Sequence, residues 1–462
     1  MTQLLIVSFA IYMAAAALSY AVLVLLSLRA DRKYHAGAAA RQRQLDALHI
    51  HAPAVTLLAP AKNEELIISE SVKIFLALPY PNLSLVIVDD GSTDRTFQIL
   101  HDEFCLVPSP EPLPLETLRH QPIISVWKSA THPPLTVLKK LASRASKGDA
   151  NNAGLEVIQT PLVFTTDVDS ILEPHTISRM VVRMQETGAV AVGCPLRPLN
   201  GVRVVDGMVI QPSLPHTYWE LSQVAEYERA FQLRQGWDYL GMLNNISGAA
   251  GLFQVAALRE IGGYRPDTTA EDLASTFSFH LCNQKIALEP GVNVFTQVPE
   301  SMKSLRSQRK RWARGLIDNL WYYRTLLNPF RHGRLSLLPL WLGLFEMAEP
   351  FIETAGLAVI LALAIAGDVP LRGWLTLLSG LVFSTALSAI CIYQRHRLYP
   401  RLSSQDAVKL ACFSILEITP LKIPLSLLWR MLGTIEYLSG DTSWEPLPRQ
   451  TFSEESKTCA IS

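Results

Sequence analysis

Two aspartates separated by one residue follow a short apolar run in the middle of the chain. The run, Leu162–Thr166, is rich in aliphatic and β-branched residues and leads directly into Asp167 and Asp169. Because side chains alternate along a strand, carboxylates two positions apart project to the same side. Such a pair can hold Mg²⁺ or Mn²⁺, which take oxygen ligands and share them with substrate phosphates. A solvated turn is the alternative, and the position after a buried strand favours the metal.

Two other acidic pairs are also candidates for chemistry. Asp89 and Asp90 follow the aliphatic run Leu85–Val88, and the Asp-Gly-Ser sequence that continues from them is also common in turns and helix caps. Glu271 and Asp272 follow a stretch rich in glycine and proline. A carboxylate at such a place can act as a base, and it can equally stabilise the start of a helix through the helix dipole.

A basic motif with an aromatic residue, Gln308-Arg309-Lys310-Arg311-Trp312, lies closer to the C-terminus. Guanidinium groups can stabilise negative charge on a phosphate group, and an indole ring offers a flat apolar face. The alternative is an interfacial helix whose arginine and tryptophan side chains lie among lipid headgroups.

The acidic motifs require a sheet that brings them together. We expect strands at Val55–Leu58 and Leu85–Val88 with a helix at 64–78 between them, which makes a β-α-β unit. In open parallel sheets, ligands bind beyond the carboxyl ends of the strands. We therefore expect Glu64 and the aspartate pairs that follow the second and third strands to converge on one crevice.

Two segments after the second strand have a more local interpretation. A helix is expected over 93–104, with Ser92 or Thr93 as its N-cap. A proline-rich segment at 106–136 follows, with an apparent short strand at Ile123–Trp127. We interpret it as a surface excursion without a part in the chemistry.

Composition excludes several classes of protein. The chain has 462 residues, of which 49% are hydrophobic and 18% charged, and its 41 basic residues balance its 41 acidic ones. A net charge of zero argues against a nucleic acid as the main partner. The six cysteines form no C-x-x-C pair and the histidines no H-E-x-x-H motif, so neither a disulfide scaffold nor a zinc site is indicated.

The hydrophobic excess lies at the two ends of the chain. Leu4–Leu28 contains no charged residue and is long enough to cross the ~30 Å hydrocarbon core of a bilayer. A cleaved signal peptide would have basic residues before a shorter apolar run, whereas here the basic residues follow it at 29–43. The positive-inside rule then predicts that the N-terminus lies outside and the central domain in the cytosol.

The C-terminal third contains further apolar segments. Leu335–Gly367 is interrupted by acidic residues and a proline, so its first half could lie at the interface and its second half cross the membrane. Trp374–Tyr393 is a clear span, and Val408–Trp429 is either a span or a re-entrant helix because of prolines in its middle. We expect four spans in total.

In order and spacing, the motifs resemble those of membrane-integrated family 2 glycosyltransferases. This group includes bacterial poly-N-acetylglucosamine, cellulose and hyaluronan synthases and the Nod-factor chitooligosaccharide synthase. The resemblance covers residues 50–320 and rests on Pro60–Glu64, Val88–Ser92, Lys147 with Asn152–Leu155, Thr166–Ser170, Ser247-Gly248, Ala270–Leu273 and Gln308–Trp312.

The resemblance implies a GT-A fold, an α/β domain with a Rossmann-like mixed sheet, inserted between N-terminal and C-terminal transmembrane helices. It implies an inverting transfer from a UDP-sugar, with Mg²⁺ or Mn²⁺ as cofactor. By position, Asp272 would be the catalytic base with Glu271 beside it, and Asp167 and Asp169 would hold the metal. Donor-binding residues would be Glu64, Asp90, Lys147, Asp167 and Arg311, whereas Gln308, Arg309 and Trp312 would close over diphosphate and acceptor.

The expected organisation follows from the same resemblance. It comprises an N-terminal transmembrane helix at 1–30, the GT-A domain at 50–320, an interfacial helix at 321–334, transmembrane or interface helices at 335–438 and a C-terminal tail at 439–462. The protein would be a multi-pass protein of the bacterial inner membrane with its catalytic domain in the cytosol. Its partners would be a nucleotide sugar, a polysaccharide or lipid acceptor, the bilayer and export proteins.

Three functions compete. The first is a synthase that extends a β-linked polysaccharide, and the second is a single-transfer enzyme that glycosylates a membrane lipid. A transporter or scaffold is the third, but it does not explain the transferase motifs. Cellulose is a doubtful product because the chain contains no F-x-V-T-x-K segment. Ser443-Trp444 with Arg449 resembles a C-terminal sequence of related synthases that would place the tail in the cytosol. A cytosolic tail favours a re-entrant Val408–Trp429 over a fourth span, so the two topologies remain alternatives.

Overall fold

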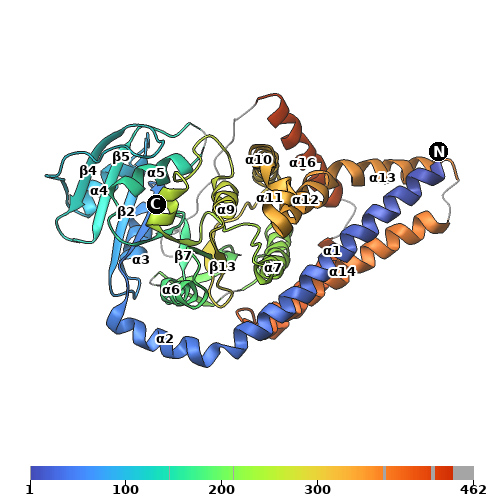
Figure 1. Cartoon of the computed structure of the whole chain (residues 1–462), viewed down its shortest axis with the longest axis horizontal. Helices are drawn as coiled ribbons and strands as arrows, with labels where there is room; N and C mark the ends of the chain where they lie inside the picture. The colour runs from blue at the N-terminus through green and yellow to red at the C-terminus, as the bar shows by residue number, and fades with distance from the viewer. Residues whose placement is uncertain are drawn as a thin grey trace, which may run out of the picture. The chain divides into compact units, whose positions relative to one another are not determined.

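The computed structural model describes residues 2–144, 146–205, 207–211, 213–367, 371–417 and 422–440. The described chain forms two compact units. Lys33–Pro215 and Leu243–Val298 make up the first, the sheet unit, and Met1–Arg32, His216–Met242 and Pro299–Glu445 make up the second, the helical unit. Figure 1 labels the helices and strands of both. Ser443, Trp444 and Arg449 lie outside the described residues.

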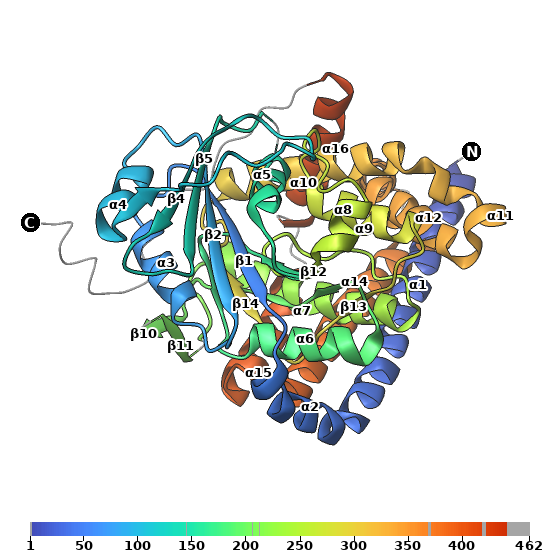
Figure 2. The same ribbon diagram turned by 60° about the vertical axis from the view of Figure 1, so that its left-hand side comes forward.

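The sheet unit is built on a mixed sheet, nine-stranded in the part of the chain that is described, with the order β13-β8-β12-β6-β1-β2-β5-β4-β3. The strands are β1 Val55–Ala61, β2 Leu83–Asp90, β3 Leu106–Pro108, β4 Ile123–Ser129, β5 Leu135–Lys140, β6 Leu162–Thr165, β8 Ala191–Gly193, β12 Gly251–Gln254 and β13 Ile286–Leu288. The neighbours β6, β1, β2 and β5 are parallel, so their carboxyl ends meet at one edge. Figure 2 labels β1, β2 and β5 of this group. The expected β-α-β unit is confirmed.

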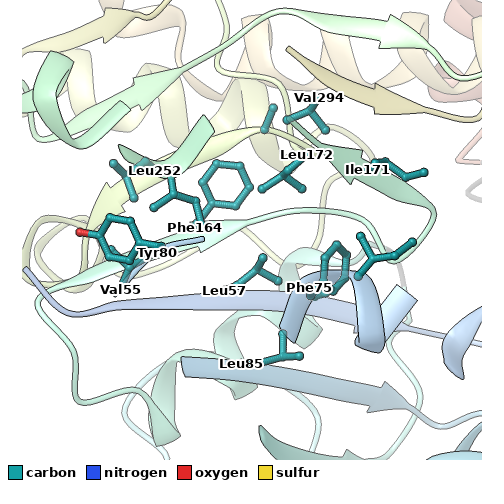
Figure 3. Packing of buried hydrophobic residues seen from close by; sticks show 14 of the residues in the cluster. Val55, Leu57, Phe75, Tyr80, Leu85, Phe164, Ile171, Leu172, Leu252 and Val294 are labelled. Atoms are coloured by element: carbon teal, nitrogen blue, oxygen red, sulfur yellow. The ribbon is translucent and has the colours of Figure 1, made fainter. Parts of the chain in front are cut away.

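Seven helices of the described sheet unit are α2 Ala38–His51, α3 Ile68–Leu76, α4 Thr96–Glu103, α5 Gly148–Val157, α6 Thr176–Thr187, α8 Val255–Glu260 and α9 Glu271–Leu281. Successive residues of β1 enter opposite cores because strand side chains alternate. Leu57 packs with Phe164 and Leu252 against α3, α4 and α6 (Figure 3), whereas Leu58 packs with Val163 against α5, α8 and α9. Burial on both faces explains why these strands are continuously apolar.

Smaller sheets complete this unit. A three-stranded sheet has the order β7-β14-β9, formed by Ser170–Leu172, Val294–Thr296 and Leu196–Pro198 in the described residues. A hairpin pairs β10, Arg203–Val205, with β11, Met208–Gln211.

Two local expectations were wrong. The helix after β2 begins at Thr96 and has no side-chain cap from Ser92 or Thr93, because the Asp94 Oδ1 atom accepts hydrogen bonds from the Thr96 backbone N–H and hydroxyl. The proline-rich segment is not only a surface excursion, because it extends the main sheet. Its expected strand at Ile123–Trp127 is confirmed as β4, which pairs antiparallel with β5, and β3 pairs antiparallel with β4.

The helical unit contains α1 Thr2–Ala36 as far as Arg32, and all of α7 Tyr218–Tyr239, α10 Met302–Tyr322, α11 Pro329–His332, α12 Leu337–Leu342, α13 Glu349–Ile365, α14 Leu371–Leu398, α15 Ser404–Glu417 and α16 Lys422–Leu438. The 3-10 turns η1 Arg324–Leu327 and η2 Gly333–Ser336 and the π-helical turn η3 Gly343–Met347 connect several of these helices. Its interior includes a buried carboxylate, Asp31, which accepts hydrogen bonds from Gln232, Gln235 and Tyr399.

Two stretches of the described chain are long and apolar enough to cross a membrane, Leu5–Ala36 and Pro329–Ile365. They correspond to the first two spans expected from the sequence. The third expected span lies within α14, and the fourth is divided between α15 and α16, with 418–421 outside the described residues. Four spans therefore remain a prediction.

Candidate active site

The loops after β1 and β2 are joined by hydrogen bonds at the carboxyl edge of the sheet. Asn63 has a left-handed backbone with φ of 57°, and its Oδ1 atom accepts a hydrogen bond of 2.8 Å from the Thr93 N–H. The Asn63 N–H donates to the Ser92 hydroxyl over 3.0 Å, and the Glu64 N–H donates to the Thr96 hydroxyl over 2.7 Å. These bonds fix the buried Glu64 beside the end of β2.

The two aspartates at the end of β2 have different environments. Asp89 is fully buried, and burial raises the pKa of its carboxyl although a hydrogen bond from Ser92 opposes the change. The Asp90 Oδ1 atom accepts hydrogen bonds from Lys140 Nζ at 2.7 Å and from the Ser143 N–H at 2.8 Å. Lys140 was not among the residues expected from the sequence.

Lys147 joins two of the expected acidic groups. It occupies the N-cap position of α5, and its Nζ atom lies 2.5 Å from Asp167 Oδ1 and 3.9 Å from Glu271 Oε1. Burial lowers the pKa of the Lys147 ammonium, but the charges of Asp167 and Glu271 outweigh this effect and the pKa is raised. A permanent cation therefore lies between the strand-end aspartate and the first turn of α9.

Asp167 and Asp169 contact different groups. Asp167 is half-buried beside Lys147, whereas Asp169 is buried and its Oδ1 atom lies 3.4 Å from the Ser170 hydroxyl and 3.5 Å from the Thr296 hydroxyl. No cluster of three or more His, Cys, Asp or Glu side chains suited to a metal is found among the described residues. One or two carboxylates suffice for Mg²⁺ or Mn²⁺ when substrate phosphates complete the coordination. Asp167 and Asp169 therefore fit a Mg²⁺ or Mn²⁺ ion whose remaining ligands come from the substrate.

The Asp272 carboxylate is oriented by the loop before β12. Its Oδ2 atom accepts hydrogen bonds from Asn245 Nδ2 at 3.1 Å and from the Gly248 N–H at 3.3 Å, and its Oδ1 atom accepts one from the Leu273 N–H at 2.8 Å. The N-cap of α9 is Ala270, without a side-chain cap, so Asp272 lies in the first turn rather than at the cap. It is half-buried and remains accessible to a ligand.

The basic motif belongs to α10 of the helical unit. The Arg309 guanidinium forms a bidentate ion pair with Glu226 of α7, at 2.6 and 2.8 Å, and lies 4.5 Å from the centre of the Trp312 ring. Gln308 is buried, Arg311 is half-buried and Trp312 is 38% exposed. Arg309 thus has a structural partner within its own unit, and closure of these residues over a substrate stays a prediction.

The sequence matches two models of glycosyltransferase domains. Residues 56–111 match the family described as glycosyl transferase family 2, and residues 123–315 match glycosyltransferase like family 2. Together the two matches span more than half of the chain.

Curated relatives include poly-β-1,6-N-acetyl-D-glucosamine synthases of staphylococci. The protein of Staphylococcus epidermidis strain ATCC 35984 is 24% identical over 286 residues, which span 59% of this chain and 58% of the relative. The protein of Staphylococcus aureus strain COL is 24% identical over 296 residues, which span 63% of this chain and 60% of the relative. The chain thus matches less than two thirds of the length of these relatives.

Among solved structures, a mannosyltransferase from Pyrobaculum calidifontis in complex with GDP-Man and Mn²⁺ has a similar fold. The likeness covers 89% of this chain and 99% of that protein, with a TM-score of 0.54 and 19% sequence identity. At this identity the likeness concerns the fold alone, and it confirms the expected GT-A class. From its sequence matches and its mixed sheet, the chain is a family 2 glycosyltransferase.

Proposed function

We propose that the chain is an inverting transferase that moves a sugar from a UDP-sugar to a growing β-linked polysaccharide at the inner face of the membrane. The observation that carries this proposal is the arrangement around Lys147, whose ammonium contacts Asp167 and approaches Glu271 at the start of α9. A cation, a strand-end aspartate and an oriented carboxylate, Asp272, are the groups that transfer from a sugar diphosphate requires.

The donor would lie along the carboxyl edge of the sheet. In this proposal Glu64 and Asp90 contact the nucleoside, because Thr96 fixes the Glu64 backbone and Lys140 at the end of β5 fixes the Asp90 carboxylate. Lys147 and Asp167 contact the diphosphate end of the donor. A raised pKa keeps Lys147 protonated at neutral pH, so its charge is available where the leaving diphosphate becomes more negative.

A divalent cation would belong to the same place. Asp167 and Asp169 would hold Mg²⁺ or Mn²⁺, and the cation would neutralise the charge that develops on the diphosphate. Lys147 lies beside Asp167 and neutralises part of its charge. The exposure of Asp167 leaves room for phosphate oxygens, whereas Asp169 is buried among hydroxyl groups.

Asp272 would act as the general base. The attacking hydroxyl group loses its proton as the new glycosidic bond forms, so a carboxylate within hydrogen-bond reach is sufficient. The hydrogen bonds from Asn245 and Gly248 fix the orientation of that carboxylate before the acceptor binds. Attack opposite the leaving diphosphate inverts the configuration at the sugar carbon.

The names of the staphylococcal relatives support a polysaccharide, and specifically an N-acetylglucosamine polymer, as the product. Gln308, Arg311 and Trp312 would close over diphosphate and acceptor, with Arg309 holding Trp312 in place through its ring contact. The apolar helices Leu5–Ala36 and Pro329–Ile365 support a membrane location. Glycosylation of a lipid is the second candidate, since an acceptor at the membrane would meet the same groups.

The test uses the full chain, purified in detergent, with a panel of labelled UDP-sugars and GDP-mannose in the presence of Mg²⁺ or Mn²⁺. We expect transfer from one UDP-sugar, UDP-N-acetylglucosamine first, into a product that chromatography resolves as a polymer. Asp272→Asn is the inactive control. A product with a single sugar on a lipid would show that the enzyme glycosylates a lipid, the second candidate, and does not make a polymer. Transfer from GDP-mannose alone would overturn the assignment of a UDP-sugar as donor.

A further inference from the structure

Lys140 is a fully buried lysine at the end of β5, beside the strand end that carries Asp90. Its Nζ atom lies 2.7 Å from Asp90 Oδ1 and 2.8 Å from Asp149 Oδ1. It also lies 2.5 Å from the Leu141 carbonyl oxygen and 3.2 Å from the Ser143 hydroxyl. Burying an ammonium is costly unless it is paired, and here two carboxylates and two neutral oxygens surround it.

These contacts make the two oxygens of the Asp90 carboxylate unequal. Oδ1 accepts hydrogen bonds from Lys140, from the Ser143 N–H at 2.8 Å and from the Ser143 hydroxyl at 2.7 Å. All of these contacts with described residues fall on the same oxygen. Oδ2 is therefore the oxygen that can accept a hydrogen bond from a ligand, since the oxygens of a carboxylate act as acceptors.

Lys140 also connects the two ends of the expected donor site. Asp149 lies in the first turn of α5, two residues after Lys147, and its Oδ1 atom also accepts a hydrogen bond from the Gln121 N–H at 3.0 Å. Lys147 in turn contacts Asp167. The nucleoside end and the diphosphate end of the site are thus joined at the N-terminus of α5 by two ion pairs, of which the one between Lys140 and Asp149 is buried.

We propose that Lys140 is a positioning residue for the nucleobase. It holds the Asp90 carboxylate by its Oδ1 atom, so that Oδ2 is directed to a ring N–H group of the base. Uracil and guanine carry such an N–H group, whereas cytosine and adenine have an acceptor nitrogen at the corresponding place. This inference rests on the proposed function, because it requires Asp90 to face the nucleoside.

The experiment measures the affinity of the full-length enzyme for UDP and for CDP by calorimetry, together with KM and kcat for the donor. Lys140→Met should raise the Kd of UDP by ~10-fold or more, the effect of losing a hydrogen bond to a charged group. The Kd of CDP and the kcat at saturating donor should change by less than ~3-fold, because neither depends on a hydrogen bond from the base to Asp90 Oδ2. A merely structural lysine would weaken both nucleotides alike.

Ser143→Ala covers the case in which Lys140→Met does not fold. It removes one hydrogen bond to Asp90 Oδ1 without exposing a buried charge, and it should raise the Kd of UDP but not that of CDP. Equal weakening of UDP and CDP in Lys140→Met or in Ser143→Ala would overturn the proposal.

Asp90→Asn separates failure of this inference from failure of the proposed function. If Asp90→Asn weakens UDP binding while Lys140→Met and Ser143→Ala retain the ratio of UDP to CDP affinity, only the role of Lys140 is refuted. If Asp90→Asn binds UDP like the wild type, the nucleoside does not lie at Asp90 and both proposals fail.

Discussion

The Asn245 Nδ2 atom lies 3.1 Å from the Asp272 Oδ2 atom, and this hydrogen bond joins the loop before β12 to the first turn of α9. The Asn245 Oδ1 atom lies 3.5 Å from the Thr276 hydroxyl, one turn further along the same helix. Asn245, in the loop before β12, therefore fixes the orientation of the Asp272 carboxylate, the proposed base. A base that must meet a hydroxyl group in one geometry depends on such support.

Replacing Asn245 by alanine should lower kcat by ~10-fold while the donor KM stays near the wild-type value, because the base loses orientation but the donor keeps its contacts. Steady-state kinetics with the preferred UDP-sugar measure both constants. A higher donor KM with an unchanged kcat would place Asn245 in donor binding instead.

Asp272→Asn tests the base itself. The variant should bind the UDP-sugar normally by calorimetry, because nucleoside and diphosphate contact other residues, and it should lower the rate of transfer by at least ~10²-fold. Asp267→Asn, which changes an exposed aspartate in the loop before α9, is the matched control and should transfer at the wild-type rate. Wild-type turnover in Asp272→Asn would leave Glu271 and Asp272 with a structural role only.

Metal dependence follows from Asp167 and Asp169. EDTA should abolish transfer, and added Mg²⁺ or Mn²⁺ should restore it. Asp169→Asn should lose activity and keep the thermal unfolding temperature of the wild type, since an amide can still interact with the Ser170 and Thr296 hydroxyl groups. Full activity of Asp169→Asn, or transfer that persists in EDTA, would refute the proposal that the reaction requires a metal held by these aspartates.

Much of the sheet could be predicted from the sequence. Strands β1, β2 and β6 are buried on both faces, so they appear as continuous apolar runs, and the acidic residues that follow them mark the carboxyl edge. The parallel strands place Glu64, Asp90 and Asp167 after carboxyl ends that meet at one edge, as the topology rule predicts, and their convergence on one ligand stays a prediction. Lys147, which the resemblance assigns to the donor, contacts Asp167 and lies 3.9 Å from Glu271.

The supporting residues could not be predicted, because their partners are distant in sequence. Lys140 is 50 residues from Asp90, and Asn245 is 27 residues from Asp272. A lone lysine at a strand end is usually solvated, and only the parallel pairing of β2 with β5 brings Lys140 beside Asp90. The first residue of α4 depends on the Asp94 side chain, which accepts a hydrogen bond from the Thr96 N–H. Hydrophobic periodicity and helix propensity cannot locate such a single contact.

Membrane orientation can be tested with one introduced cysteine on each expected side. The exposed Cys105, Cys282 and Cys412 are first replaced by serine, together with Cys459. A cysteine at the exposed Pro110 should then resist a membrane-impermeant thiol reagent in intact cells and react after lysis. A cysteine at Thr2 should react in intact cells. The reverse pattern would place the sheet unit outside, away from cytosolic nucleotide sugars.

His280 predicts how the stability of the sheet unit depends on pH. It is buried in α9, the Nε2 atom lies 2.9 Å from the Leu243 carbonyl oxygen, and burial lowers the pKa of the imidazole although this hydrogen bond opposes the change. Below its ordinary value of 6.5, the unfolded chain binds a proton that the folded chain does not. Protonation therefore favours unfolding, and the stability contributed by His280 decreases as pH falls from 6.5 towards the lowered pKa.

The measurement is the thermal unfolding temperature of the purified protein between about pH 7.5 and about pH 5, the range in which histidine titrates. The wild type should lose stability on acidification, and His280→Gln should show a shallower dependence because glutamine does not titrate. His175→Gln, which changes an exposed histidine before α6, should retain the wild-type slope. An identical slope in His280→Gln and the wild type would assign the acid sensitivity to other groups, since any group whose pKa differs between the folded and unfolded chain couples unfolding to proton uptake.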